Sequence, residues 1–141
     1  MSWLIFALLS AIFAALVAIF GKIGLKEIDS TLATTVRSII MAGFLFVTSL
    51  IGRKISLGAI DKFTSKDWLF IVLSGVAGAL SWLFYFMALK QGDASKIVAI
   101  DRLSIIFVVV FAALFLGEAL SWKSGLGAIL ILSGAILISL K

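Results

Sequence analysis

The sequence has 141 residues, of which 63% are hydrophobic and 13% are charged, whereas soluble domains are about half apolar and about a quarter charged. It contains no cysteine and no histidine, which excludes a disulfide framework, a cysteine nucleophile and imidazole metal ligands. The net charge of +5 is spread over separated loops, as in membrane flanks and unlike a nucleic-acid surface. We therefore expect an all-α membrane protein that contacts the lipid bilayer and binds no nucleic acid.

Five stretches are long and apolar enough to cross a bilayer, which takes about 20 residues at about 1.5 Å each. The first stretch lacks the basic start and the small-residue cleavage site of a signal peptide, so it counts as a span. Thr64 and Asp67 have the spacing of a helix-start capping pair just before the third stretch. We expect one domain over residues 1-141 with five transmembrane helices, at residues 3-21, 30-52, 68-89, 97-117 and 124-140.

An odd number of spans puts the two termini on opposite sides of the bilayer. The N-terminal side then carries five basic residues, Arg53, Lys54, Lys62, Lys66 and Lys123, and the other side also carries five, Lys22, Lys26, Lys90, Lys96 and Lys141. Because the Lys and Arg bias of short loops sets orientation, this balance predicts dual topology, in which copies insert both ways. The alternative is a single orientation, set by the first span or by the larger loop on the N-terminal side.

The sequence offers few groups for catalysis. Of its acidic residues, only Asp101 lies well inside a span, so no two acids share an intramembrane helix face. This excludes paired-carboxylate chemistry and an acidic metal cage, and a serine nucleophile would have no histidine as its base. We expect no enzyme, no metal and no cofactor.

Three ionisable residues lie inside spans, Arg37, Asp101 and Arg102, where a charge costs several kcal/mol unless it has a partner or a water-filled path. At about 1.5 Å per residue, Arg37 lies about 10 Å and Asp101 about 6 Å from the same membrane face. These depths predict an Asp101–Arg37 ion pair, with Arg102 extending toward the headgroups. The pair either fixes helix register statically or takes part in gating or substrate binding.

Polar residues also gather on three predicted spans. Thr34, Arg37 and Ser38 share one face of the second span, and Asp101 and Ser104 share one face of the fourth. On the third span, Ser81, Trp82 and Tyr85 suit either a cavity wall or simple helix packing. The predicted substrate-binding or gating residues are Arg37, Asp101, Arg102, Lys22, Thr34, Ser38, Ser81, Trp82, Tyr85 and Ser104. The glycine-rich last span is expected to serve packing or dimer formation.

Five short segments occur in an order that resembles the EamA-like domain of the drug/metabolite transporter superfamily. They are FGKIG at 20–24, TSKDW at 64–68, ALKQGDAS at 88–95, IDRLS at 100–104 and FLGE at 115–118. The resemblance implies transport of a small organic metabolite or drug-like solute across the cytoplasmic (inner) membrane. Typical members have ten spans in two inverted five-span repeats, with the solute site between them.

Since this chain resembles one repeat, the resemblance implies that an oppositely inserted copy supplies the other half, as an antiparallel homodimer. Each face would then hold one cluster of Lys22, Arg37, Asp101 and Arg102, suited to alternating access. The cationic members of this cluster favour a carboxylate or phosphate on the solute, and Asp101 offsets part of their charge. Two alternatives remain, a lipid-linked-sugar carrier and a non-transporting membrane partner subunit.

The chain departs from the family pattern in two places. Such domains often carry a proline just before or within the fourth span, but this chain has none, so we expect no pre-set helix break there. The four-span exporters of the same superfamily rely on a glutamate in their first span, and residues 3-21 contain no acid. Proton-coupled export of organic cations by that mechanism is therefore not expected.

Overall fold

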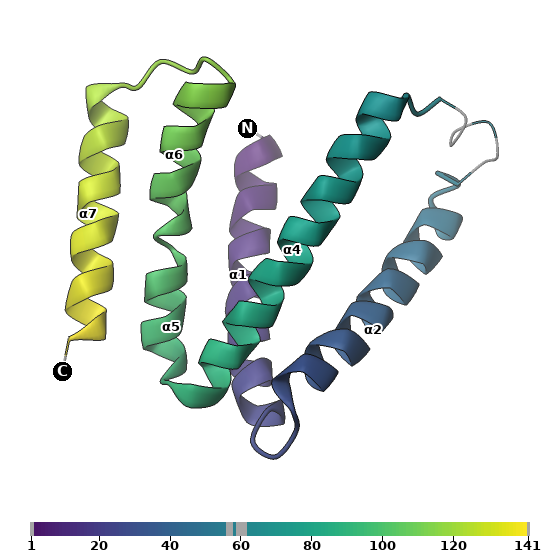
Figure 1. The fold of residues 1–141 in the computed structure, drawn as a ribbon, viewed down its shortest axis with the longest axis horizontal. Helices are drawn as coiled ribbons and strands as arrows, with labels where there is room; N and C mark the ends of the chain where they lie inside the picture. The colour runs from purple at the N-terminus through teal and green to yellow at the C-terminus, as the bar shows by residue number, and fades with distance from the viewer. Residues whose placement is uncertain (1, 56–57, 59–61, 141) are drawn as a thin grey trace. The chain divides into compact units, whose positions relative to one another are not determined.

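A computed structural model describes residues 2–55, 58 and 62–140; Lys141, counted above, lies outside them. The described residues form helices and connectors without a strand. The helices are α1 (Ser2–Gly24), α2 (Ser30–Ile51), α4 (Ser65–Gln91), α5 (Ala94–Asp101), α6 (Ser104–Phe115) and α7 (Trp122–Ser139) (Figure 1). With α5 and α6 counted together, five helices are long and apolar enough to cross a membrane. This confirms the predicted all-α class with five membrane-length helices.

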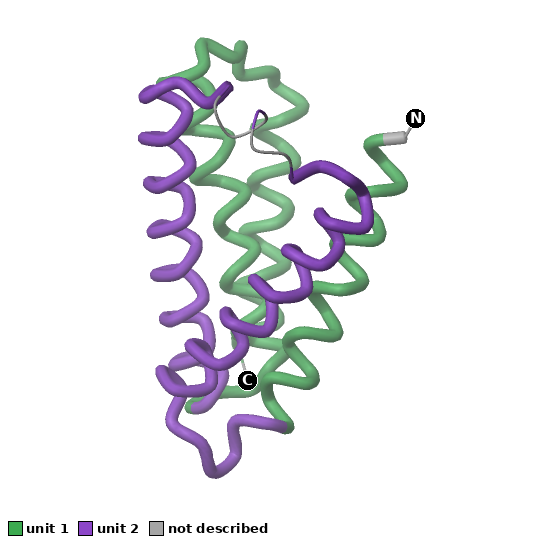
Figure 2. Tube along the Cα trace, turned by 90° about the vertical axis from the view of Figure 1, so that its right-hand side faces the viewer, with its two compact units in different colours: residues 1–23, 91–141 green, residues 24–90 purple. Residues whose placement is uncertain are grey.

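The chain divides into two compact units, shown in different colours in Figure 2. One unit consists of residues 1–23 and 91–141, and therefore contains most of α1 together with α5, α6 and α7. The other unit consists of residues 24–90 and contains α2 and α4. Each unit is described separately below, and the prediction of one domain over residues 1-141 stays a prediction.

In the 24–90 unit, α2 and α4 lie closest where α2 begins and α4 ends, and they diverge toward their connector (Figure 1). Asp29 caps α2, because its carboxylate accepts the backbone N–H groups of Thr31 and Leu32 at 2.9 and 3.0 Å. At the end of α4, the Lys90 ammonium donates to the carbonyl of Ile28 at 2.9 Å. These bonds hold the α1–α2 connector onto the two helix ends.

The predicted capping pair at the start of α4 is confirmed. The Asp67 carboxylate accepts both the backbone N–H and the hydroxyl of Thr64, at 2.9 and 2.7 Å. In return, the Thr64 hydroxyl oxygen accepts the Asp67 backbone N–H at 3.2 Å. This reciprocal arrangement satisfies backbone donors that the first turn of a helix leaves without partners.

In the other unit, α5 packs along α7, whereas α6 makes far fewer contacts with α7. Ala99 on α5 and Ala135 on α7 are both buried, and such small side chains let two helices approach closely in lipid. The ammonium of Lys22 on α1 donates to the carbonyl of Gly92, at the start of the α4–α5 connector, over 2.7 Å. Gly117 ends α6 with φ +68°, a backbone conformation that favours glycine.

The prediction that the fourth span has no built-in break was wrong. Helix α5 ends at Asp101 and α6 begins at Ser104, although this region contains neither proline nor glycine. Around the break the backbone forms hydrogen bonds to the residue three positions earlier, as in a 3₁₀ turn. The Leu103 N–H donates to the Ile100 carbonyl at 2.9 Å, and the Ile105 N–H donates to the Arg102 carbonyl at 3.1 Å. Because these shorter bonds still satisfy backbone donors inside an apolar environment, the helix can be interrupted without a proline.

Candidate functional site

Arg37, the arginine inside α2, lies against the aromatic side chains of α4. Its guanidinium carbon is 3.8 Å from the centroid of the Trp82 ring and 5.2 Å from that of Phe86. The shorter distance is that of a guanidinium over the face of an indole, a favourable cation–π arrangement. Such a contact is stronger away from water, because water then no longer competes with the ring for the cation.

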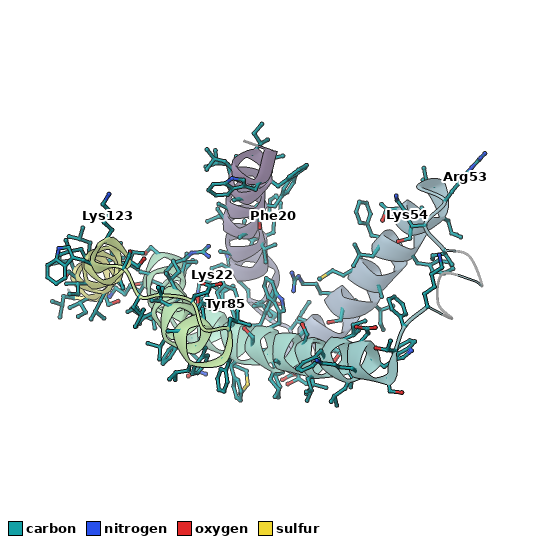
Figure 3. The ribbon with its side chains drawn as sticks, turned by 90° about the horizontal axis from the view of Figure 1, so that it is seen from above. Phe20, Lys22, Arg53, Lys54, Tyr85 and Lys123 are labelled. Carbon is teal, nitrogen blue, oxygen red and sulfur yellow. The ribbon has the colours of Figure 1, made fainter. Side chains whose placement is uncertain are left out.

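Trp82, Tyr85 and Phe86 form a compact aromatic cluster on one side of α4. Their ring centroids are separated by 5.6 Å for Trp82–Tyr85, 5.8 Å for Trp82–Phe86 and 5.8 Å for Tyr85–Phe86. Trp82 and Tyr85 are nearly perpendicular, at 81°, which is an edge-to-face geometry. Phe86 is buried, whereas Trp82 and Tyr85 are partly exposed (Tyr85 is labelled in Figure 3). Two rings of the cluster can therefore contact a ligand.

The sequence brings Arg37 and Trp82 together because they lie at similar depths on antiparallel helices. Arg37 follows the first residue of α2 by about 10 Å of helix, and Trp82 precedes the last residue of α4 by about 13 Å. The spacing of Trp82 and Phe86 then puts two rings on the same face of α4. The guanidinium thus meets aromatic rings at membrane depth instead of extending to the surface.

A second feature of this unit is a groove of about 390 Å³ between α2 and α4. One wall carries hydroxyl groups and the other is apolar; the lining residues are Thr31, Thr34, Thr35 and Ser38 on α2 and Val76, Ala79, Leu80 and Leu83 on α4. The hydroxyl of Thr34 donates to the Ser30 carbonyl at 2.7 Å, and that of Ser38 donates to the Thr34 carbonyl at 2.8 Å. The predicted polar face of α2 is thus divided between the groove and the stacked Arg37.

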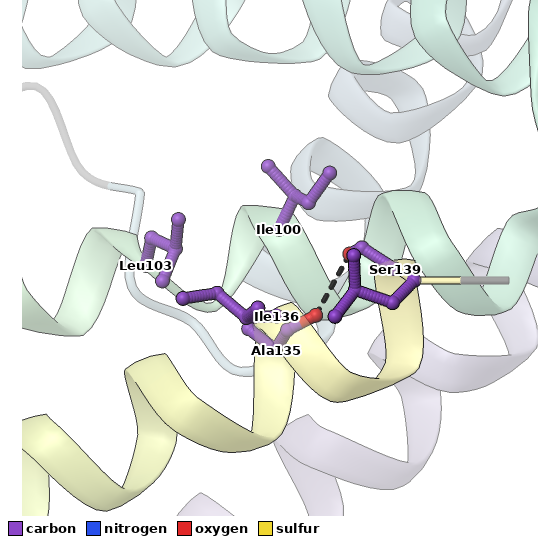
Figure 4. A pocket seen from close by; sticks show the side chains of 6 residues that line it. Ile100, Leu103, Ala135, Ile136 and Ser139 are labelled. Carbon is purple, nitrogen blue, oxygen red and sulfur yellow. Dashed lines mark hydrogen bonds between the residues drawn. The ribbon is translucent and has the colours of Figure 1, made fainter.

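The predicted site residues of the other unit lie around the α5–α6 break. Asp101 is the last residue of α5, Arg102 lies in the break and Ser104 begins α6; all three are exposed. Beside them is an apolar pocket of about 280 Å³ between these helices and α7, lined by Ile100, Leu103, Ala135, Ile136, Ser139 and Leu140 (Figure 4). The Ser139 hydroxyl there donates to the Ala135 carbonyl at 2.7 Å, so this pocket offers little polar recognition.

The remaining predicted residues are more dispersed. Ser81 is exposed on α4 and is not among the residues that line the groove. Lys22 makes its bond to Gly92 within its own unit. The expected Asp101–Arg37 pair joins residues of the two units and stays a prediction. Within the described part of the chain, no three His, Cys, Asp or Glu side chains are placed to hold a metal ion.

Sequence reasoning missed the direct contact between Arg37 and Trp82, although it named both residues. It predicted an ion pair for Arg37, and either a cavity wall or simple helix packing for Trp82. It also missed Phe86, the buried ring that completes the cluster. The signal was available in the four-residue spacing of Trp82 and Phe86 opposite the arginine of the preceding span.

The comparisons with known proteins agree with this architecture. The sequence profile of the EamA-like transporter family matches residues 1–140. The chain belongs to the EamA-like transporter family. A relative from a Sinorhizobium species, described as an uncharacterized transporter in the cobO 3′ region, is 41% identical over 138 residues, covering 98% of this chain and 96% of the relative. No solved structure matches the chain.

Membership of the EamA-like family and the five apolar helices together indicate a multi-pass membrane protein that transports a small solute. Both the family and the relative point to a transporter rather than an enzyme. The transmembrane helices imply direct contact with the lipid bilayer, which explains why large apolar side chains such as Phe44 and Leu130 are exposed over most of their surface.

Proposed function

We propose that the chain carries a small organic solute across the cytoplasmic membrane by alternating access, as an antiparallel homodimer of oppositely inserted copies. The observation that carries this proposal is the combination of five membrane-length helices with a balanced set of flanking Lys and Arg residues. An odd number of spans puts the two termini on opposite sides of the bilayer, and a five-to-five balance of flanking basic residues favours neither orientation. Oppositely inserted copies would form a pair of inverted repeats with a solute site between them.

The placement of the basic residues supports the same proposal. Arg53 and Lys54 lie just beyond the end of α2, and Lys123 extends from the first turn of α7 (Figure 3). With five spans, the proposal puts all three on the same side of the bilayer. Lys26 is an exposed charge on the other side. These charges lie in short connectors or helix ends, where they act most strongly on orientation.

Within each copy, we assign solute contact to Arg37, Trp82 and Tyr85, because they combine a cation with partly exposed rings inside membrane-length helices. Thr34 and Ser38 line the adjoining face of α2. The gating residues in this proposal are Lys22, Ser81, Asp101, Arg102 and Ser104. Asp101, Arg102 and Ser104 lie at the α5–α6 break, where a helix can bend during gating.

The test is solute flux through liposomes that contain the purified chain alone. We expect saturable uptake of at least one member of a radiolabelled panel of amino acids, organic acids and sugars, and we expect Arg37→Gln to lower it at least tenfold. Arg53→Lys is the control, because Arg53 lies outside the helices and lysine leaves the balance of flanking charges unchanged. Flux that begins only when a second, unrelated membrane protein is added would contradict the proposal and support a partner subunit.

A further inference from the structure

Among the described residues of the 24–90 unit, no carboxylate forms an ion pair with Arg37. Its guanidinium carbon lies 3.8 Å from the centroid of the Trp82 ring and 5.2 Å from that of Phe86. Asp29 caps the start of α2 and Asp67 caps the start of α4, so both of these acids are engaged at helix ends. A cation at membrane depth is costly without a counter-charge, and the rings stabilise Arg37 without neutralising its charge.

The stacking also determines which part of the guanidinium is available. A guanidinium is planar, and its five N–H donors point outward in that plane. The Trp82 ring, 3.8 Å from the guanidinium carbon, accepts no conventional hydrogen bond from these donors, so a carboxylate can accept hydrogen bonds from them. A stacked arginine is pre-organised for a bidentate contact, because its side chain is already ordered.

The surroundings of that edge favour a solute with a flat apolar body. Trp82 and Tyr85 are both partly exposed, and their rings meet at 81°. Two perpendicular rings can contact both the face and the edge of a third ring. The Tyr85 hydroxyl and the Trp82 indole are the polar ends of this surface.

We propose that Arg37, stacked on Trp82 in the α2–α4 unit, binds the carboxylate of a planar organic anion whose apolar body packs against Trp82 and Tyr85. The inference rests on the proposed function, since it names the class of solute for the same site. The shared chemistry is an oxyanion on the guanidinium edge, which a phospholipid phosphate could also supply. We assign the site to the free organic carboxylate, because Arg37 contacts rings at membrane depth instead of extending toward the headgroups.

Trp82 itself can report binding. The other three tryptophans, Trp3, Trp68 and Trp122, are 72%, 47% and 80% exposed and lie outside the aromatic cluster. A triple variant with Trp3→Phe, Trp68→Phe and Trp122→Phe therefore keeps the cluster and leaves Trp82 as the one tryptophan that fluoresces. In the uncharged detergent dodecyl maltoside, we expect 3-phenylpropanoate to change Trp82 fluorescence saturably. We expect 3-phenylpropanamide, its uncharged counterpart, and 3-phenylpropylamine, its cationic counterpart, to bind at least tenfold more weakly. Equal affinity for the acid and the amide would overturn the inference without the use of any arginine variant.

Variants of Arg37 then test the geometry of the contact. Arg37→Gln should weaken 3-phenylpropanoate binding at least tenfold, and Arg37→Lys should weaken it several-fold, because lysine keeps the charge but lacks the planar fork. Arg53→Gln should leave it unchanged. An Arg37→Gln protein that keeps its helical circular dichroism and binds the acid as tightly as before would contradict the inference.

Short-chain phosphatidylglycerol separates the two sources of oxyanion. If this lipid saturates the Trp82 fluorescence response and 3-phenylpropanoate neither produces the response nor competes with the lipid, the site belongs to a headgroup and the inference is wrong.

Failure of the inference and failure of the transport proposal give different results. Acid binding without flux of any solute would remove only the transport proposal, whereas flux that is indifferent to Arg37→Gln would remove only the assignment of Arg37.

Discussion

The guanidinium carbon of Arg37 lies 3.8 Å from the centroid of the Trp82 ring. This cation–π contact joins α2 and α4, the second and third membrane-length helices. The arginine needs a favourable surface inside the bilayer, and a tryptophan at this depth is away from the interface where indoles usually gather. The pair therefore contributes to stability as well as to the proposed binding of solute.

The stability contribution can be measured with a double-mutant cycle of Arg37→Gln and Trp82→Leu. We expect a coupling energy of about 0.5–2 kcal/mol, the range for cation–π contacts from exposed to desolvated sites. The measurement is reversible unfolding of the detergent-solubilised protein. A matched cycle of Arg53→Gln and Trp68→Leu should give coupling near zero, and a similar coupling in both cycles would show that the Arg37 contact has no specific energy.

Asp29 makes the start of α2 sensitive to acid. The backbone N–H of Leu32, followed by the N–H of Thr31 and the charge of Lys90, holds the pKa of the Asp29 carboxyl below its ordinary value. A carboxyl whose pKa is lower when folded stabilises the protein above its unfolded pKa of about 4, and this stabilisation is lost as the pH falls through the folded pKa. We expect wild-type stability to fall below about pH 4 relative to Asp29→Asn, because asparagine caps a helix equally well but does not titrate. Parallel stability profiles down to about pH 2 would refute this role for the carboxylate.

Lys22 should contribute to folding through its 2.7 Å bond to the Gly92 carbonyl. Lys22→Met keeps most of the apolar stem and removes the donor, so we expect the free energy of unfolding to fall by about 1 kcal/mol. Lys26→Met, at an exposed position of the neighbouring connector, is the control and should change stability by less than about 0.5 kcal/mol. Equal effects of the two substitutions would mean that the bond to Gly92 contributes nothing measurable.

The close packing of α5 should make Ala99 intolerant of larger side chains. Ala99 is 8% exposed, on the helix that packs along α7. Ala99→Leu should lower the free energy of unfolding by about 1–3 kcal/mol, because extra methylene groups at a closely packed contact force the surroundings to move. Ala42→Leu places the same side chain on an exposed part of α2 and should be nearly neutral. A neutral Ala99→Leu would show that α5 can move aside at little energetic cost.

The helices and their caps were predictable from sequence because their physical signals are local. Lipid cannot hydrogen-bond the backbone, so a long apolar stretch must be helical, and the Thr64–Asp67 pair identified the start of α4 correctly. The α5–α6 break was not predictable from a search for proline, because it consists of a tightened backbone turn with ordinary residues. The Arg37–Trp82 contact depends on the relative depth of two helices, which composition and spacing within each helix do not reveal.

Topology tests the central claim, antiparallel pairing of oppositely inserted copies, most directly. Because the sequence has no cysteine, the single variants Ser65→Cys and Ser95→Cys can be labelled selectively in intact cells with a membrane-impermeant maleimide. Both serines are exposed, lie on opposite predicted sides and carry no charge that would alter the flanking balance. We expect each site to be labelled in only part of the population, and the rest to become reactive after the membrane is opened. Complete labelling of one site with none at the other would establish a single orientation and contradict the antiparallel homodimer.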